Sequence, residues 1–395
     1  MRVLDLFTGC GGLSLGFSLA GFEITAGVEW WPPAVESYQV NHPRAKVFKG
    51  DIREIKPLLF TGYSTGYFAV IVGGPPCQAY SISGNRNEID PRGDLYLDFF
   101  DVVEYFQPQF FVMENVKGLL SMKKFPSNLP PSVYQEILTA FLKLARYKHF
   151  QRIRAQRQLF PPEQQEYDIL KGMRPSLLQK IDQYRVPLVT LILEKISKIG
   201  YHATYRVLNA VNYGVPQNRE RVFFIGSKTK DFLTDIFPSP THSCPAGPTR
   251  LDAFLNIHSK PWVTARDAID DLKTMPENTA FSHVFTHHSP EFIEKIKHTK
   301  PGESLYTHYS EAYYRLRPTE PAYTVKENHG GVFLHYDQDR CLTPRELARL
   351  QSFPDSFLFK GTKSEILKQI GNAVPPLLAK AIAMKLKKFV KSDIP

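Results

Sequence analysis

Short apolar runs recur along the first part of the chain, and each one stops close to a glycine or an acidic residue. The strand-length runs are Val3–Phe7, Glu23–Val28, Phe68–Val72 and Phe110–Met113. Buried strands of a parallel sheet form nearly continuous apolar runs, and the helices that connect them cover the faces of the sheet. The pattern therefore predicts an α/β fold with a doubly wound, mostly parallel sheet.

The turn after the first run is rich in glycine. The segment Gly9–Gly12 precedes a helix expected over Leu13–Ala20. Glycines let the backbone approach a ligand, and the start of a helix offers free N–H groups to an anion. Glu29 and Asp51 end the next two strands. An acidic residue about 20 positions beyond such a turn holds ribose hydroxyls in Rossmann-type sites. This edge of the sheet is thus predicted to bind an adenosine-containing cofactor, either NAD or S-adenosylmethionine.

A thiol and a carboxylate follow the next two strands. Cys77 ends the stiff turn Gly73–Cys77, and Glu114 follows the run after it. Neighbouring parallel strands end at the same edge, so both side chains are expected in one crevice. Alternatively, Cys77 is a small buried hydrophobe and Glu114 meets a helix dipole. The polar segment 79–93 between them is expected to be a lid that contacts phosphate through Arg86 and Arg92.

Composition narrows the class of protein. The formal charge of +10 favours a polyanionic partner, with nucleic acid first. The four cysteines lie far apart without a CxxC pair, which argues against a zinc site or a disulfide framework and for a reducing cytoplasm. No apolar run has transmembrane length, and the first strand starts too early for a signal peptide. With 395 residues, two folding units are expected.

A basic helical insert is expected over residues 122–185. From Lys123 to Arg185 there are 12 Lys/Arg and 5 Asp/Glu. Ser132 and Gln135 suggest a capping box, and apolar residues then recur at helical spacing. The insert either contacts phosphates or forms a solvated helical pair that covers the sheet. We favour the second interpretation, because the basic residues do not cluster on one obvious face.

Six segments resemble, in order, the motifs of DNA (cytosine-5) methyltransferases of bacterial restriction–modification systems. They are Asp5–Gly12, Pro75–Gln78, Glu114–Val116, Gln217–Arg221, Leu342–Pro354 and Gln369–Val374. The resemblance spans nearly the whole chain. It implies a Rossmann-like, S-adenosylmethionine-dependent methyltransferase fold and a smaller irregular target-recognition domain.

The resemblance also implies a mechanism. The Cys77 thiolate adds to cytosine C6, which makes C5 nucleophilic toward the methyl group of S-adenosylmethionine. Glu114 binds N3 and the exocyclic amine and stabilises the charge that develops. Arg219 and Arg221 hold the phosphate and base of the flipped nucleotide. The target atom lies inside a duplex, so base flipping is required.

By the same resemblance, Glu29 binds the ribose, Trp30 stacks on adenine and Asp51 accepts from adenine N6. The full set of implied cofactor residues is Phe7, Gly9, Gly11, Gly12, Glu29, Trp30, Asp51, Ile52, Pro76, Leu95, Asn372 and Val374. The implied DNA contacts are Gln78, Ser81, Ser83, Arg86, Arg92 and Gln217. Because the chain starts at its first strand, the helix beside that strand is expected from the C-terminal segment Pro375–Val390.

The resemblance implies three regions: a catalytic domain over 1–227, a target-recognition domain over 228–335 and C-terminal motifs over 336–395 that return to the catalytic domain. In the recognition region, six residues are candidates to read bases or phosphates: Arg250, Lys260, Arg266, His283, His287 and His288. The expected partner is double-stranded DNA. A cytoplasmic monomer is expected, without metal or membrane, functionally paired with a restriction endonuclease but not in a stable complex.

Other functions fit the sequence less well. A tRNA cytosine-5 methyltransferase shares the Pro-Pro-Cys-Gln turn, but its Cys-Phe-Thr element is missing, since Cys244 and Cys341 are followed by Pro245 and Leu342. An amino-methylating enzyme needs an Asp/Asn/Ser-Pro-Pro-Tyr turn, and this chain has cysteine there. A non-catalytic DNA-binding module would lack the thiol or the carboxylate, and both are present.

Overall fold

The core of the protein is a seven-stranded sheet with the strand order β3-β2-β1-β4-β5-β9-β8. The computed structural model describes residues 1–76, 95–126, 129–244, 259–306, 312–327 and 333–391. The strands are β1 (Arg2–Leu6), β2 (Glu23–Glu29), β3 (Lys46–Lys49), β4 (Val70–Gly73), β5 (Phe110–Val116), β8 (His202–Asn209) and β9 (Glu220–Ser227). The first five are mutually parallel, and β9 runs antiparallel to both β5 and β8. The predicted α/β class with a mostly parallel sheet is confirmed.

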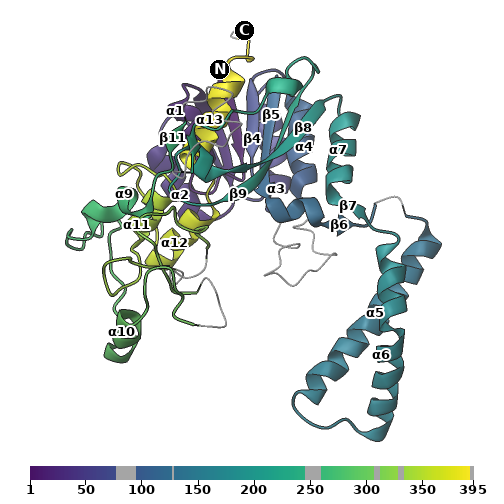
Figure 1. Cartoon of the computed structure of the whole chain (residues 1–395). Helices are drawn as coiled ribbons and strands as arrows, with labels where there is room; N and C mark the ends of the chain where they lie inside the picture. The colour runs from purple at the N-terminus through teal and green to yellow at the C-terminus, as the bar shows by residue number, and fades with distance from the viewer. Residues whose placement is uncertain (77–94, 127–128, 245–258, 307–311, 328–332, 392–395) are drawn as a thin grey trace.

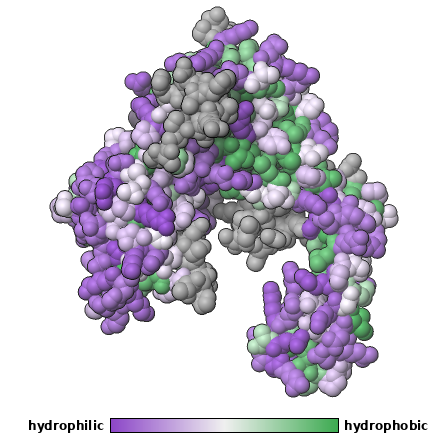
Figure 2. All heavy atoms as spheres, viewed as in Figure 1, coloured by the Kyte–Doolittle hydropathy of each residue, from purple (hydrophilic) through white to green (hydrophobic). Residues whose placement is uncertain are grey.

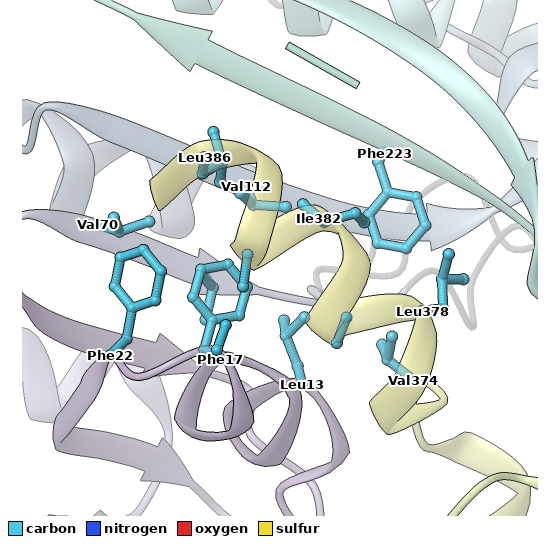
Figure 3. Packing of buried hydrophobic residues seen from close by; sticks show 14 of the residues in the cluster. Leu13, Phe17, Phe22, Val70, Val112, Phe223, Val374, Leu378, Ile382 and Leu386 are labelled. Carbon is cyan, nitrogen blue, oxygen red and sulfur yellow. The ribbon is translucent and has the colours of Figure 1, made fainter. Parts of the chain in front are cut away.

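Helices cover both faces of this sheet. On one face lie α1 (Gly12–Leu19) and α13 (Pro376–Lys387), which share a hydrophobic cluster with β4 and β5 (Figure 3). On the other face a second cluster joins the sheet to α3 (Ile52–Gly62), α4 (Leu95–Phe106) and α7 (Leu188–Lys198). The helix α2 (Pro32–Asn41) follows β2. The central strands are apolar on both sides because both faces are buried, as in parallel sheets generally.

The two ends of the described chain meet on the first of these faces. The last helix, α13, packs against α1, and both termini lie at the same end of the molecule (Figure 1). The helices approach so closely at Gly16 that an added Cβ would come within 2.3 Å of the Cβ of Ala379. Lys387 also donates a hydrogen bond to the carbonyl of Ala20. The expectation that a C-terminal helix packs at the start of the fold is confirmed.

A second lobe lies beside the sheet and is built from short elements (Figure 1). They are α9 (Ala265–Ile269), α10 (Pro290–Lys297), β12 (Tyr314–Arg315), β13 (Phe333–Leu334), α11 (Pro344–Leu350) and α12 (Lys363–Asn372). The short pair β10 (His242–Ser243) and β11 (Lys260–Pro261) lies instead against the sheet itself (Figure 1), where the Thr241 N–H donates a hydrogen bond to the Asn212 carbonyl. One hydrophobic cluster includes α9, β13, α11 and α12. The expected boundary at residue 336 lies inside this cluster, and α13 is the C-terminal helix that packs on the sheet.

A long helical hairpin projects away from the sheet (Figure 1). Its helices are α5 (Pro131–Arg154) and α6 (Pro161–Asp182), and the short pair β6 (Lys123–Lys124) and β7 (Val186–Pro187) closes its base. Its two hydrophobic clusters contain residues of the insert alone. The expected helical pair is therefore present, but it does not cover the sheet.

The predicted capping box of this insert is wrong. The residue that caps α5 is Pro130, which makes no side-chain hydrogen bond to the helix. Pro131 occupies the first helical position, where the fixed φ of proline is well suited, and this places Ser132 inside the first turn.

Among all the helices that the structure describes, none is both long and apolar enough to cross a membrane.

Candidate active site

Glu114 and Arg221 meet at the carboxyl edge of the parallel strands. Glu114 lies near the end of β5, and the antiparallel pairing sets Arg221 opposite Val116. The Arg221 Nε lies 3.0 Å from the Glu114 Oε1, and the two side chains are only 14% and 13% exposed. Burial raises the pKa of the Glu114 carboxyl, while the positive charges of Arg221 and Arg219 lower it in part. The site thus holds a carboxyl group that keeps its proton to higher pH than usual.

The turn that leads to Cys77 lies against this carboxylate. A Cβ built on Gly74 would come within 3.0 Å of the Glu114 Oε2. The Asn115 amide donates a 3.0 Å hydrogen bond to the carbonyl of Pro75. The ends of β4 and β5 are therefore tied together here, as expected from their position at one edge. Cys77 itself lies outside the described residues, as do Gln78, Ser81, Ser83, Arg86 and Arg92.

Arg219 has other partners than the sequence suggested. Its side chain is buried, and its guanidinium donates to the carbonyls of Val325, Gly371 and Ala373 at 2.7–3.0 Å. Both terminal nitrogens of the guanidinium are therefore engaged by protein backbone. Arg219 thus joins the start of β9 to Val325 and to the C-terminal end of α12, and a direct contact with a flipped nucleotide does not follow from this geometry.

Gln217 was expected to contact DNA, but in this structure its side chain is enclosed by protein. The side chain is completely buried. Its Nε2 donates 2.8 Å hydrogen bonds to the Leu350 carbonyl and to the Gln351 Oε1, while its Oε1 accepts from the Val325 N–H. The side chain is thus enclosed and bonded at both ends, so it fastens the loop before β9 to the second lobe.

Glu29 organises the other side of the edge. Its carboxylate accepts hydrogen bonds from the N–H groups of Gly9, Trp30 and Trp31 at 2.8–3.0 Å. Burial raises its pKa, and these backbone hydrogen bonds lower it in part. Gly9 lies in the turn after β1, where Phe7 and Gly11 also have positive φ values of 59° and 103°. The expected glycine turn and the expected acidic residue are therefore in direct contact.

Two further expected cofactor residues lie close to this turn. Trp30 follows Glu29 and is 65% exposed, which is unusual for a tryptophan and leaves its ring available for stacking. A Cβ on Gly12 would come within 2.3 Å of the Val374 carbonyl, so Val374 lies directly against the glycine turn.

The remaining expected cofactor residues have other surroundings. The Asp51 carboxylate caps α3 and pairs with Arg53, which lowers the pKa of Asp51. Ile52 and Leu95 are buried in the core beside the sheet. Asn372 is exposed and donates a 2.8 Å hydrogen bond to Glu327. Pro76, the last residue before Cys77, is half-buried.

The sequence interpretation missed a buried polar group beneath the glycine turn. Ser14 donates a 2.6 Å hydrogen bond to Asp5, and its Oγ lies 2.8 Å from the hydroxyl of Tyr38. Burial is the main cause that raises the pKa of Asp5 to about 7, and the charge of Glu29 adds to the effect. The sequence signal that could have revealed this group is Asp5, an acidic residue inside an apolar strand.

In the second lobe, His283 is not exposed for base reading. It is fully buried, and its Nδ1 lies 3.0 Å from the Thr343 hydroxyl. Lys260, Arg266 and His287 are exposed, whereas Arg250 lies outside the described residues. Among the described residues, no three His, Cys, Asp or Glu side chains are grouped as metal ligands.

Known proteins resemble this chain in sequence and in fold. The family model for C-5 cytosine-specific DNA methylase matches residues 1–154 and 178–388. The type II methyltransferase M.DdeI of Desulfomicrobium norvegicum is 30% identical over 434 residues, covering 99% of this chain and 90% of that protein. M1.HphI of Haemophilus parahaemolyticus is 32% identical over 405 residues, covering 98% and 87%.

Two solved structures support the fold. One is described as a DNA modification methyltransferase encoded within a prophage (E. coli), with a TM-score of 0.63, 23% identity and coverage of 98% of this chain and 99% of that one. The other is Dnmt2 of S. pombe, with a TM-score of 0.57, 16% identity and coverage of 98% and 99%. The family match and the curated relatives establish the activity: the chain belongs to the C-5 cytosine-specific DNA methylase family and methylates cytosine C5 in DNA.

Proposed function

We propose that Cys77 and Glu114 carry out this methylation together at the carboxyl edge of β4 and β5. The observation that carries the proposal is the buried pair of Glu114 and Arg221, 3.0 Å apart, with Gly74 of the Cys77 turn against the same carboxylate. In the sequence, Cys77 is three positions beyond Gly74, and we propose that its thiol reaches a base bound by Glu114.

The reaction begins when the Cys77 thiolate forms a bond to cytosine C6. The electron pair of the C5–C6 double bond then becomes available at C5, and the carboxyl of Glu114 holds a proton at N3 that balances the developing charge. The raised pKa of Glu114 suits this role because the carboxyl keeps its proton to higher pH than an exposed one does. After C5 gains the methyl group, a base removes the C5 proton, and the Cys77–C6 bond breaks to restore the aromatic ring.

S-adenosylmethionine fits the other end of the edge and would supply the methyl group. Glu29 presents a buried carboxylate beside a glycine turn, which is the combination that binds a ribose next to a backbone-lined pocket. Trp30 offers an exposed ring on which adenine can stack. Gly11, Gly12 and Val374 would line the pocket, since Val374 contacts the turn directly. Asp51 would reach adenine only if Arg53 moved from its carboxylate.

The covalent step is tested with duplex DNA that contains 5-fluorocytosine at the target position. Fluorine at C5 cannot leave as the proton does, so the Cys77–C6 adduct should persist as a complex that survives denaturing electrophoresis. Cys77→Ser should abolish this complex and methyl transfer. A Cys77→Ser protein that retains full methyl transfer would contradict the mechanism.

The substrate sequence is found by bisulfite sequencing of DNA from cells that express the protein. The related type II methyltransferases support a role that protects a specific double-stranded sequence from a partner restriction endonuclease. We propose a cytoplasmic monomer that binds DNA with the second lobe, in which the recognition domain would lie approximately within residues 228–335. If the expressed protein left DNA without 5-methylcytosine, a tRNA substrate would be tested next.

A further inference from the structure

The helical hairpin carries most of the excess positive charge of the protein. Residues 123–185 contain 12 basic and 5 acidic residues, which gives a formal charge of +7, whereas the whole chain has +10. The family model leaves residues 155–177 unmatched, which includes the tip of the hairpin and much of α6. The activity common to the family therefore does not account for this segment.

The acidic residues of the hairpin are almost all neutralised within it. Four of the five form ion pairs with basic side chains of the same insert. These pairs are Lys123–Asp182, Arg146–Glu166, Arg157–Glu163 and Lys180–Glu136. The fifth, Asp168, accepts a hydrogen bond from Gln164. Little negative charge is therefore left to offset the other basic residues.

On the two helices of the hairpin, six basic side chains have no acidic partner among the described residues. One of them, Arg154, lies over the ring of Tyr167. The other five are Lys143, Lys148 and Arg152 on α5, and Lys171 and Arg174 on α6. All except the half-buried Lys143 are exposed. Exposed cations that no carboxylate of the protein neutralises create a positive potential that attracts a polyanion. Five such cations are enough to contact several phosphates of one duplex.

These five side chains lie along the middle and outer part of the hairpin. The rings of Tyr147 and Tyr167 stack with centroids 5.3 Å apart, and Arg146 pairs with Glu166, so the two antiparallel helices are aligned at this level. Lys143 and Lys171, four residues from the two tyrosines, therefore lie at about the same height. With 24 residues, α5 is about 36 Å long at 1.5 Å per residue.

The hairpin and the second lobe project on the same side of the sheet. The hairpin leaves the sheet a few residues after Glu114, through the 3₁₀ turn Lys117–Ser121 and the pair β6–β7. The lobe with α9–α12 lies across from it (Figure 1). Figure 2 shows that the molecule is hollowed between the two and that the hairpin surface is mostly hydrophilic. A duplex brought to Glu114 would therefore have the lobe on one side and the hairpin on the other.

We propose that the hairpin binds the phosphate backbone of duplex DNA outside the recognised sequence, through Lys143, Lys148, Arg152, Lys171 and Arg174. This inference rests on DNA being the substrate and extends the interface to a second arm, opposite the recognition lobe. Phosphate contacts carry no sequence information; they add affinity that falls with salt. The hairpin holds the duplex in place while the second lobe reads the bases.

The test compares two variants with the same change of charge. The hairpin variant carries Lys148→Gln, Arg152→Gln, Lys171→Gln and Arg174→Gln. In the control variant, four exposed lysines at the edge of the sheet away from Glu114 are changed to glutamine. These are Lys198, Lys228, Lys230 and Lys388, for which no ion pair is found among the described residues. Dissociation constants are measured over a range of salt concentrations, on a long duplex and on a duplex trimmed to the methylated sequence.

On the long duplex, the hairpin variant should bind more weakly and show a shallower dependence of affinity on salt. The slope of log K against log salt should fall by up to about 3.6, since each neutralised phosphate contributes about 0.9. The control variant should keep the wild-type slope. On the trimmed duplex at saturating concentration, the methylation rate of both variants should match the wild type, because the catalytic residues are unchanged.

A second variant guards against misfolding. Residues 129–182 are replaced by a short Gly-Ser linker, which keeps the β6–β7 base, and it should lose the same affinity for long DNA. Equal salt slopes for the wild type and both hairpin variants would overturn the proposal. The proposal would also be overturned if the hairpin variants kept the wild-type salt slope but lost self-association or a bound protein. The hairpin would then be assigned to a protein partner. If the wild-type protein methylated none of the duplexes, the proposed function would be rejected instead.

Discussion

Neighbouring arginines of one motif have different surroundings in this structure. Arg221 faces the Glu114 carboxylate, whereas Arg219, two positions earlier, binds three backbone carbonyls and is buried. Within a strand, side chains two positions apart point to the same face, so the difference arises because Arg219 precedes β9 and Arg221 lies within it. In the proposed mechanism, Arg221 would act on the substrate through Glu114, and Arg219 would hold the surrounding chain segments in position.

Substitution of the two arginines should separate these roles. Arg219→Met leaves three buried carbonyls without a donor and should destabilise the protein by about 3–5 kcal/mol. Arg221→Met should change stability less, but should lower the methylation rate by about 10²–10³, the range for loss of one group that stabilises developing charge. Urea unfolding and single-turnover methylation measure the two effects. Equal losses of stability for both variants would contradict this division.

A pH-dependent effect on stability is expected from Asp5. Its folded pKa is about 7, above the ordinary value of 3.8, so the folded state binds a proton that the unfolded state has released. The free energy of unfolding should therefore fall as pH rises from about 4 to 7 and then level off, by at most about 4 kcal/mol at 1.36 kcal/mol per pH unit.

The Asp5→Asn variant isolates this effect because asparagine does not titrate. Its free energy of unfolding should lack the part of the pH dependence that Asp5 contributes, so the difference between wild type and variant should change steadily between pH 4 and 7. Urea unfolding at several pH values measures it. A constant difference over that range would show that Asp5 does not hold its proton in the folded protein.

At the scale of the element, the sequence predicted the features that local residue patterns determine. The strands from Val3 to Met113 were predictable because both faces of the sheet are buried and the runs are apolar. The contact of Glu29 with Gly9 was predictable because parallel strands end at one edge. Gln217 was misjudged because its partners, Leu350 and Gln351, lie more than a hundred residues away in sequence.

The hairpin shows another limit of local pattern. An apolar stripe at helical spacing indicates that a helix is covered, but it does not say by what. In the hairpin the buried apolar side chains of each helix pack against the other helix and not against the sheet, as the stacked Tyr147 and Tyr167 show. The helices were therefore predictable, and their direction was not.

A tight helix pair allows a prediction at this scale. Gly16→Val should be severely destabilising, because the added side chain meets the Ala379 Cβ and the backbone of Pro376 and Lys380. Backbone cannot move aside as a flexible side chain can, so the two helices must separate. The control is Gly172→Val on α6, where an added Cβ meets nothing within 4 Å. Thermal unfolding of both variants should show a large decrease for Gly16→Val and a small one for the control.

At the scale of the molecule, the last helix completes the hydrophobic core that the first strand begins. Leu378, Ile382 and Leu386 of α13 are fully buried in the same cluster as Val3 and Phe17 (Figure 3). Burying each of these three side chains is worth about 1.5–3 kcal/mol, so together they are comparable to the whole stability of a typical domain, about 5–15 kcal/mol.

Truncation tests this dependence. A chain that ends at Pro375 lacks α13 and should fail to fold cooperatively, with exposed hydrophobic surface that binds a fluorescent dye. A chain that ends at Lys391 keeps the helix and should unfold as the full-length protein does. Circular dichroism during thermal unfolding distinguishes the two. A stable, cooperative fold for the shorter chain would contradict the role assigned to α13.

The close packing of α13 on α1 also bears on the order of events during synthesis. A ribosome adds about 5–20 residues per second, so the first strand and its helix leave it many seconds before residues 376–387 are made. Until then their apolar surface lacks its cover, and the glycine turn lacks its contact with Val374. The growing chain therefore exposes apolar surface to aggregation and to chaperones until residues 374–387 are made, and the glycine turn gains its contact with Val374 only then.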